Sequence, residues 1–273
     1  MNNSMITAGV SMNSTLKRLD MIADNIANMD TAGYKRKEAS FEEVLTTLVK
    51  HHDDFDSGGR ATPLGYTVGY GTRLSAVTLS MEQGVLQETG VATDLALEGQ
   101  GLFVVDNAGT TGYSRDGSFY FAPDPLDDGM MTLVNGKGHL VLGVDNNPIQ
   151  VDANAKVAID PRGNVLASVG GQPADIAGRI QVISVSRLDG LEQRGDNLYV
   201  LRAGVDAQNV FGGNPTDGDS PETLIRSGYM EKSNVDVSIE MTNLIQAQRA
   251  YQLAARALSS SDTMMNLANN IRR

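Results

Sequence analysis

The fold is decided by residues 235–271, which read VDVSIEMTNLIQAQRAYQLAARALSSSDTMMNLANNI. Apolar and small side chains recur there in steps of three and four, which places them on one face of a long helix. At 1.5 Å per residue this helix would be roughly 55 Å long, too long to bury that face on one small domain. Much of the face therefore needs a partner. We call it the C-terminal seam; it comprises Leu244, Ala247, Tyr251, Ala254, Leu258, Ser261, Met265 and Ala268.

A similar pattern near the N-terminus predicts a helix from about Ser4, a candidate N-cap, to Asn28, where the turn-rich residues 30–33 follow. Two arrangements would bury the two seams. They could pack between neighbouring subunits, or form an intramolecular helical hairpin on the chain's own β domain. The N-terminal seam comprises Met5, Gly9, Met12, Leu16, Leu19, Ala23 and Ile26.

The segment after the first helix carries mixed signals. Ser40 and Glu43 form a capping box, and Phe41, Val44, Leu45 and Leu48 follow at helical spacing, so we expect a short helix near 41–50. Residues 51–72 are rich in Gly and have no helical period, which indicates an extended connector.

The central part of the chain changes to short β-type runs separated by turn signals such as Asn135-Gly136 and Asp189-Gly190. No alternation of helix and strand appears, so a parallel sheet is not expected. The clearest strands are 102–105, 118–121, 140–144, 165–169, 180–185 and 198–201.

These patterns together predict an α+β fold. Residues 1–30 and 235–273 would form a terminal helical domain, with the long helices pairing like a coiled coil. Residues 31–72 would be the short helix and connector, and 73–234 a central, mainly antiparallel β domain.

Composition excludes several classes of function. The net charge of -11 argues against nucleic-acid binding, because phosphate neutralisation needs clustered Lys and Arg. The chain has no cysteine, so it has no disulfide or thiolate metal site. No stretch has the 18 or so uninterrupted apolar residues of a membrane helix, and the N-terminus lacks the pattern of a cleaved signal peptide. Membrane insertion is therefore not expected.

Searches for catalytic, cofactor and metal motifs identify no such residues. His51 and His52 are adjacent in an extended segment, so their side chains would point in opposite directions. Residues 124–129 and 214–219 resemble only fragments of calcium loops. Gly99-Gln100-Gly101 lacks the third glycine of a dinucleotide fingerprint. We predict no catalytic residue, cofactor or metal.

Three asparagines flank the helices and have two interpretations each. Asn234 could accept hydrogen bonds from the first-turn amides of the C-terminal helix, with Asp236 and Glu240 placed favourably near the positive end of its dipole. Asn25 and Asn28 could make simple turn and capping contacts. All three could equally lie in contacts between subunits.

Residues 23–35, ADNIANMDTAGYK, resemble the A-x-N-[LI]-A-N-x-x-T-x-G-[FY]-K signature of the flagellar rod and hook axial family. Residues 89–105 and 113–119 are similar to its T-G-x-x-x-D-[LF]-A-[LI]-x-G-x-G-[FL]-F-x-V and Y-[ST]-R-x-G-x-F blocks. Residues 228–251 resemble its G-x-L-E-x-S-N-V-[DN] and E-M-[TV]-x-[LM]-I-x-A-x-R-x-[YF] motifs, with Met230 in place of the usual Leu. Length and the D-L-A-L-E-G block most resemble the distal rod type or its Gram-positive counterpart.

The resemblance implies a structural subunit of the flagellar basal-body rod, stacked helically into a hollow shaft that transmits torque and serves as an export channel. It also implies export by the flagellar type III apparatus without a cleaved signal, and contact with further copies and with neighbouring rod and hook proteins. The terminal helices would form the inner tube. A hook or rod–hook junction subunit, a secreted cell-wall enzyme and a monomeric coiled-coil binding module are the alternatives.

The residues expected at contacts between subunits come from both seams and from the signature. They are Met5, Met12, Leu16, Leu19, Ile26, Asn25, Asn28, Leu244, Tyr251, Leu258 and Met265.

Overall fold

The computed structural model describes residues 3–44, 47–50, 65–107, 109–124, 129–170, 173–195, 197–211 and 223–271. The chain forms two compact units. The helical unit comprises Met1–Ala27, Lys37–Thr78 and Asp236–Arg273, and the β unit comprises Asn28–Arg36 and Leu79–Val235. The α+β class, with terminal helices and a central antiparallel β domain, is confirmed. The segment between the helix and the β domain is divided between the two units, which the sequence did not predict.

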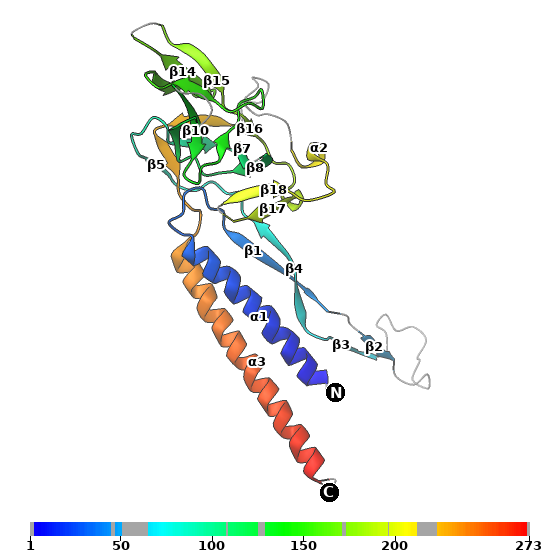
Figure 1. The fold of residues 1–273 in the computed structure, drawn as a ribbon. Helices are drawn as coiled ribbons and strands as arrows, with labels where there is room; N and C mark the ends of the chain where they lie inside the picture. The colour runs from blue at the N-terminus through cyan, green and yellow to red at the C-terminus, as the bar shows by residue number, and fades with distance from the viewer. Residues whose placement is uncertain are drawn as a thin grey trace, which may run out of the picture. The chain divides into compact units, whose positions relative to one another are not determined.

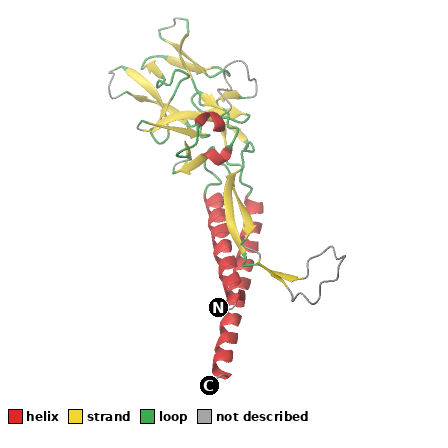
Figure 2. Cartoon of the chain, turned by 90° about the vertical axis from the view of Figure 1, so that its right-hand side faces the viewer, coloured by secondary structure: helices red, strands yellow, loops and turns green. Residues whose placement is uncertain are grey.

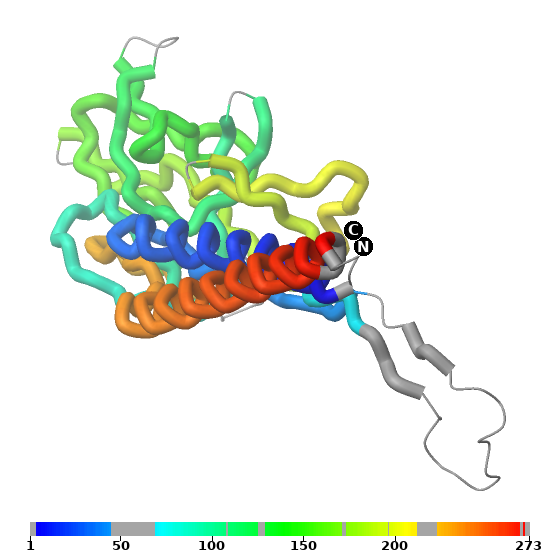
Figure 3. The backbone as a smooth tube through the Cα atoms, turned by 90° about the horizontal axis from the view of Figure 1, so that it is seen from below, coloured from blue at the N-terminus to red at the C-terminus, as the bar shows by residue number. Residues whose placement is uncertain are grey.

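The helical unit is built on α1 (Asn3–Ala27) and α3 (Val237–Ile271), which lie side by side and run in opposite directions (Figures 1 and 3). At 1.5 Å per residue α1 is about 37 Å long and α3 about 52 Å long. The Oγ atoms of Ser4 and Ser261 lie 3.0 Å apart and share a hydrogen bond, which fixes the register near the start of α1. The last residues of α3 therefore extend beyond the first residue of α1, as Figure 1 shows.

The expected short helix at 41–50 is wrong. Residues Lys37–Glu43 form strand β1, which pairs with β4 (Thr72–Leu79), and Thr47–Lys50 forms β2, which pairs antiparallel with β3 (Gly65–Val68). Burial in β1 alternates from residue to residue at its start, with Ala39 and Phe41 half-buried and Ser40 exposed. This period of two is the strand pattern, and it outweighs the capping box, whose Ser40 and Glu43 are both exposed in the strand.

The caps of both long helices also differ from expectation. The Oδ1 atom of Asp236 accepts hydrogen bonds from the amides of Ser238 (2.8 Å) and Ile239 (3.2 Å), so Asp236 and not Asn234 caps α3. Ser4 lies inside α1, where its hydroxyl bonds Ser261.

In its described residues the β unit consists of strands joined by loops, with helix in two short segments, Leu188–Gly190 and Ala207–Val210 (Figure 2). Among the described residues, its largest sheet has the order β12-β10-β11-β7-β8-β18-β17, with β16 on β7 and β9 on β10, and every pairing is antiparallel. Its strands are β7 (Leu102–Asn107), β8 (Thr110–Ser114), β9 (Phe119–Pro123), β10 (Met130–Asn135), β11 (Leu140–Val141), β12 (Gln150–Asp152), β16 (Val182–Ile183), β17 (Leu191–Arg194) and β18 (Leu198–Leu201).

Three smaller sheets complete the β unit. Strand β19 pairs with β6, β20 pairs with β5, and β13, β14 and β15 form a three-stranded antiparallel sheet. The remaining elements are β5 (Leu86–Glu88), β6 (Leu95–Glu98), β13 (Lys156–Ile159), β14 (Asn164–Ser168), β15 (Asp175–Arg179), the 3-10 turn η2 (Leu188–Gly190), α2 (Ala207–Val210), β19 (Leu224–Ser227) and β20 (Tyr229–Glu231).

Strand β7 lies at the centre of this unit and supplies both of its cores. Phe103 and Val105 enter one apolar cluster, while Leu102 and Val104 enter the other, because successive residues of a strand point to opposite faces. A strand buried on both faces reads as a continuous apolar run, which is why 102–105 was recognisable in the sequence. No helix in the described part of the chain is long and apolar enough to cross a membrane.

Candidate assembly site

The signature segment Asn28–Arg36 folds within the β unit, and a glycine decides its path. Gly33 has φ +65°, and its amide donates a 2.8 Å hydrogen bond to the carbonyl oxygen of Glu231. A Cβ atom at this position would lie 2.5 Å from the carbonyl carbon of Arg115 and 2.5 Å from the amide nitrogen of Asp116. Only glycine combines this backbone angle with so close an approach. The N-terminal signature, the Y-S-R-x-G block and the C-terminal motif therefore meet here.

A buried ionic cluster lies at this meeting point. The Glu231 carboxylate accepts hydrogen bonds from Lys35 Nζ at 2.8 Å, Arg115 Nε at 2.5 Å and the Gly84 amide at 2.8 Å. All three charged side chains are about 1% exposed. The Lys35 ammonium also donates to the carbonyl of Glu82 at 2.7 Å. Glu231, the last residue of β20, thus supplies the carboxylate that binds both Lys35 and Arg115.

The remaining guanidinium donors of Arg115 are satisfied by backbone. Its Nη1 donates to the carbonyl of Gly101 at 2.5 Å, and its Nη2 donates to Gly99 at 2.7 Å and Leu97 at 3.0 Å. The Gly99-Gln100-Gly101 turn that loosely resembled a nucleotide fingerprint therefore wraps around an arginine of the same chain.

Charge balance in the cluster depends mainly on Glu231, because it is the carboxylate that both cations contact; Glu82 adds a weaker attraction to Lys35. Burial lowers the pKa of the Lys35 ammonium, and its hydrogen bond and attraction to Glu231 only partly offset this. Burial would raise the pKa of the Glu231 carboxyl, but the attraction of Arg115 and the contacts of Lys35 outweigh it, so this pKa is lowered. Both interactions favour the ionised carboxylate.

Two asparagines of the motifs act as clamps between backbone segments. In the helical unit, Asn25 is fully buried and exchanges two 3.0 Å hydrogen bonds with the backbone of Lys37, which fixes β1 to the last turns of α1. In the β unit, Asn234 accepts from the Arg36 amide at 2.7 Å and donates to the carbonyls of Ser80 and Glu82, both at 3.0 Å. Asn28 is half-buried and lies in a turn, with its Oδ1 3.3 Å from Thr31 Oγ1.

The predicted C-terminal seam lies on the buried side of α3 as far as Ser261. Ala247 and Ser261 are buried, and Leu244, Tyr251 and Leu258 are half-buried where α3 packs on α1. Met265 lies beyond the start of α1 and is 40% exposed.

The predicted N-terminal seam is less buried. Met5, Met12, Leu19 and Ile26 are half-buried and Leu16 is 39% exposed, whereas the buried residues of α1 are Ala8, Ser14, Ile22 and Asn25. Burial in α1 therefore follows a different face from the one that the apolar spacing suggested.

A second apolar face of α3 remains exposed. Its residues follow one another in steps of three, four, seven and three, and every one of them is exposed. Steps of three and four, or of seven, are the pattern by which a helix packs against another helix. We call it the outer face of α3; it comprises Ala250, Leu253, Ala257, Met264 and Leu267.

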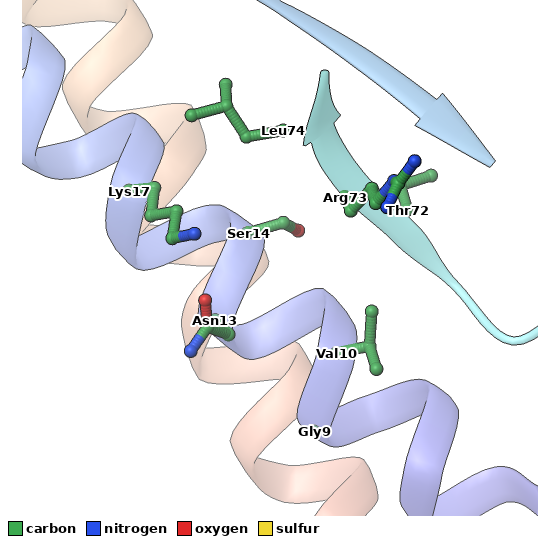
Figure 4. Close-up of a pocket in the computed structure, with 8 residues that line it drawn as sticks. All are labelled: Gly9, Val10, Asn13, Ser14, Lys17, Thr72, Arg73 and Leu74. Carbon is green, nitrogen blue, oxygen red and sulfur yellow. The ribbon is translucent and has the colours of Figure 1, made fainter. Parts of the chain in front are cut away.

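A groove of about 520 Å³ lies between α1 and the first residues of β4 (Figure 4). It is lined on α1 by Gly9, Val10, Asn13 and Lys17, and on β4 by Arg73 and Leu74. Arg73 forms an exposed ion pair with Glu42 of β1, and this pairing lowers the pKa of the Glu42 carboxyl.

Lys35, Arg115 and Glu231 were not recognised as a site from the sequence, although each lies inside one of the motifs quoted above. Charged residues that recur within otherwise apolar and glycine-rich motifs were the available signal. Among the described residues, no group of three or more His, Cys, Asp or Glu side chains could hold a metal ion. His51, His52 and residues 214–219 lie outside the described residues, as do 125–128.

Three family models match the chain in order. Residues 5–35 match the model described as "Flagella basal body rod protein", residues 96–167 the "Flagellar hook protein FlgE/F/G D1 domain", and residues 226–271 the "Flagellar basal body rod FlgEFG protein C-terminal". The cluster residues Lys35, Arg115 and Glu231 fall one in each match.

Curated relatives match over essentially the full length. The chain is 30% identical to the flagellar hook-basal body complex protein FlhP of Bacillus subtilis and 32% identical to the flagellar basal-body rod protein FlgG of Borreliella burgdorferi, with 100% of both chains covered in each case. It is 33% identical to the FlgG of Caulobacter vibrioides, over 97% of this chain and 98% of the relative.

Proposed function

The chain belongs to the family of flagellar basal-body rod and hook proteins, and from this premise we propose that many copies stack helically into the hollow axial shaft of the flagellum. The protein is a structural rod or hook subunit and not an enzyme. In the proposed shaft it transmits torque, and the central channel serves for export. The subunit itself is exported across the cytoplasmic membrane to the basal body by the flagellar type III apparatus without a cleaved signal, and contacts neighbouring rod and hook proteins.

The observation that carries this proposal is that α3 has two apolar faces. One packs on α1, in a pairing that we propose is coiled-coil-like, and the outer face stays exposed. Leu253 is 65% exposed and Leu267 57% exposed. Covering apolar area is worth about 25 cal/mol per Å², so neighbours that bury this face stabilise the assembly.

The residues predicted at contacts between subunits remain candidates. Leu16 and Met265 are accessible in the single chain and would contact neighbours directly. Leu244, Tyr251 and Leu258 would act through the pairing of α3 with α1. Asn25 and Asn28 would hold the backbone near the end of α1 in the conformation that assembly requires.

A substitution on the outer face tests the proposal. Leu253→Asp places a charge on this face, whereas Gln252→Asp adds the same charge at the neighbouring exposed position and is the matched control. Each variant replaces the native protein in the source bacterium, and its amount in purified basal bodies is measured by immunoblot, with motility scored in soft agar.

We expect Leu253→Asp to be lost from basal bodies while Gln252→Asp is retained, with both purified proteins unfolding within about 0.5 kcal/mol of native, as exposed substitutions do. Normal incorporation and motility of Leu253→Asp would refute the role of the outer face. Electron cryomicroscopy of the same basal bodies then assigns the subunit to rod or hook.

A further inference from the structure

Beyond Ser261, the described side chains of α3 have no cover in their own chain. Ser261 is the residue that meets the first turn of α1, and every side chain from 262 to 267 is exposed. Met264, Met265 and Leu267 are 64%, 40% and 57% exposed. We call residues 262–271 the overhang; at 1.5 Å per residue it is about 15 Å long.

The groove between α1 and β4 is open at the position of Gly9. A Cβ atom built on Gly9 would meet no atom within 4 Å, whereas most glycines of the β unit's core are closely surrounded. Val10 and Leu74 give the groove apolar sides, and Lys17 gives it positive charge, whereas the charge of Arg73 is balanced by Glu42. Its α1 side, from residue 9 to residue 17, extends about 12 Å along the helix axis.

We propose that the groove of one copy receives the overhang of α3 from a second copy of this chain. This inference rests on the proposed self-assembly and names the contact that produces it. The two parts have similar lengths, and the absent side chain of Gly9 leaves room for the bulk of Met264. Asp262 is the one charged residue of the overhang, and it complements Lys17; Arg73 is already paired with Glu42.

The arrangement of the two parts makes the contact head-to-tail. Each copy carries one groove and one overhang, so a copy that gives its overhang to one neighbour accepts the overhang of another. Different patches meet at such an interface, and repeating it yields a ring or an open helical filament rather than a closed dimer.

The contact cannot form within one chain. Opposite Ser4 lies Ser261, and the helices are antiparallel, so Gly9 is level with about residue 256. Within one chain Met264 therefore lies about 12 Å from Gly9 along the helix axis, whereas a disulfide requires Cα atoms within about 7 Å. The chain has no cysteine, so no native thiol competes with the engineered ones.

Disulfide trapping tests the contact. Full-length Gly9→Cys and isotopically labelled Met264→Cys are mixed, oxidised mildly, and analysed by non-reducing gel and mass spectrometry. We expect the mixed disulfide to predominate over the disulfides that each variant forms alone. Gly9→Cys mixed with Gln252→Cys, an exposed position off the outer face, is the mismatched control and should give little product.

A groove-filling variant provides an independent measurement. Gly9→Leu adds a side chain where the single chain has open space, so its far-UV circular dichroism should match the native protein. Its urea midpoint should be equal to the native value or higher, because leucine is a better helix former than glycine. Its concentration-dependent association in analytical ultracentrifugation should be lost.

The outcomes separate this inference from the proposed function. Association that persists in Gly9→Leu, or a Gly9→Cys disulfide that forms as well with Gln252→Cys as with Met264→Cys, would overturn the groove contact and leave self-assembly standing. If the native chain shows no association at any concentration and does not incorporate into basal bodies, both are overturned.

Discussion

Removing the anion of the buried ionic cluster should destabilise the protein strongly. In Glu231→Gln the carboxylate that accepts from Lys35 at 2.8 Å, Arg115 at 2.5 Å and the Gly84 amide at 2.8 Å becomes a neutral amide. Two cations whose side chains are about 1% exposed then lose the carboxylate that both contact. The attraction of Glu82 for Lys35 remains, but it is the weakest of the interactions that act on Lys35. Breaking a buried pair by removing one partner costs about 3–5 kcal/mol, a large part of the roughly 5–15 kcal/mol by which native proteins are stable.

The assay is urea unfolding of the purified chain, followed by circular dichroism and by tyrosine fluorescence, since the chain has no tryptophan. With a slope near 3 kcal/mol per M, the midpoint should fall by about 1–2 M. The control is Glu98→Gln, which removes the exposed partner of Arg226 (2.8 Å; side chains 42% and 48% exposed). Surface pairs contribute at most about 1 kcal/mol, so this variant should unfold almost like the native protein.

A third variant, Lys35→Met, makes the test more specific. Lys35→Met removes one cation and leaves a balanced Arg115–Glu231 pair, so it should cost less than Glu231→Gln. If Glu231→Gln costs no more than Glu98→Gln, or if Lys35→Met is the more damaging of the two, then charge balance is not what stabilises the cluster.

Two further predictions follow from the same contacts. The pKa of the Glu231 carboxyl in the folded protein lies below its ordinary 4.5, so its contribution to stability is complete above pH 4.5 and is lost as the pH falls through the folded pKa. Urea midpoints measured from pH 6 to pH 3 should therefore fall less steeply in Glu231→Gln than in the native chain. Equal slopes would contradict this role of Glu231. Asn25→Ala should lower the free energy of unfolding by about 1–3 kcal/mol, because it leaves the backbone groups of Lys37 without their partners. Asn28→Ala, in a half-buried turn, should lower it by less than about 1 kcal/mol in the same urea measurement. Equal losses would show that the two hydrogen bonds of Asn25 to Lys37 add no stability.

The two long helices were predictable from the sequence because their signals are local and repeated. The C-terminal pattern placed its helix within two residues of Val237–Ile271, and the predicted seam is the side that packs on α1. The N-terminal helix was also placed within one residue at each end. The buried face of this helix was not predicted, because the buried residues Ser14 and Asn25 are polar and a pattern of apolar residues does not include them.

Other features could not be predicted because they depend on tertiary contacts. The Ser40 capping box does not start a helix, because β1 pairs with β4 instead, and local residue spacing cannot predict that pairing. Asn234 serves the backbone of Arg36 and Ser80 instead of the helix that follows it. The ionic cluster draws its charges from three segments that lie far apart in the chain, so no window of sequence contains it.

The bond between Lys35 and Glu231 spans 196 positions and so ties the beginning of the chain to its end. Closing so long a loop is slow, because its entropy is lost before any contact repays it. During synthesis, the signature segment emerges from the ribosome early and waits without its counter-charge until residue 231 has been made. Any chain that terminates before that point lacks the carboxylate to which Lys35 and Arg115 donate.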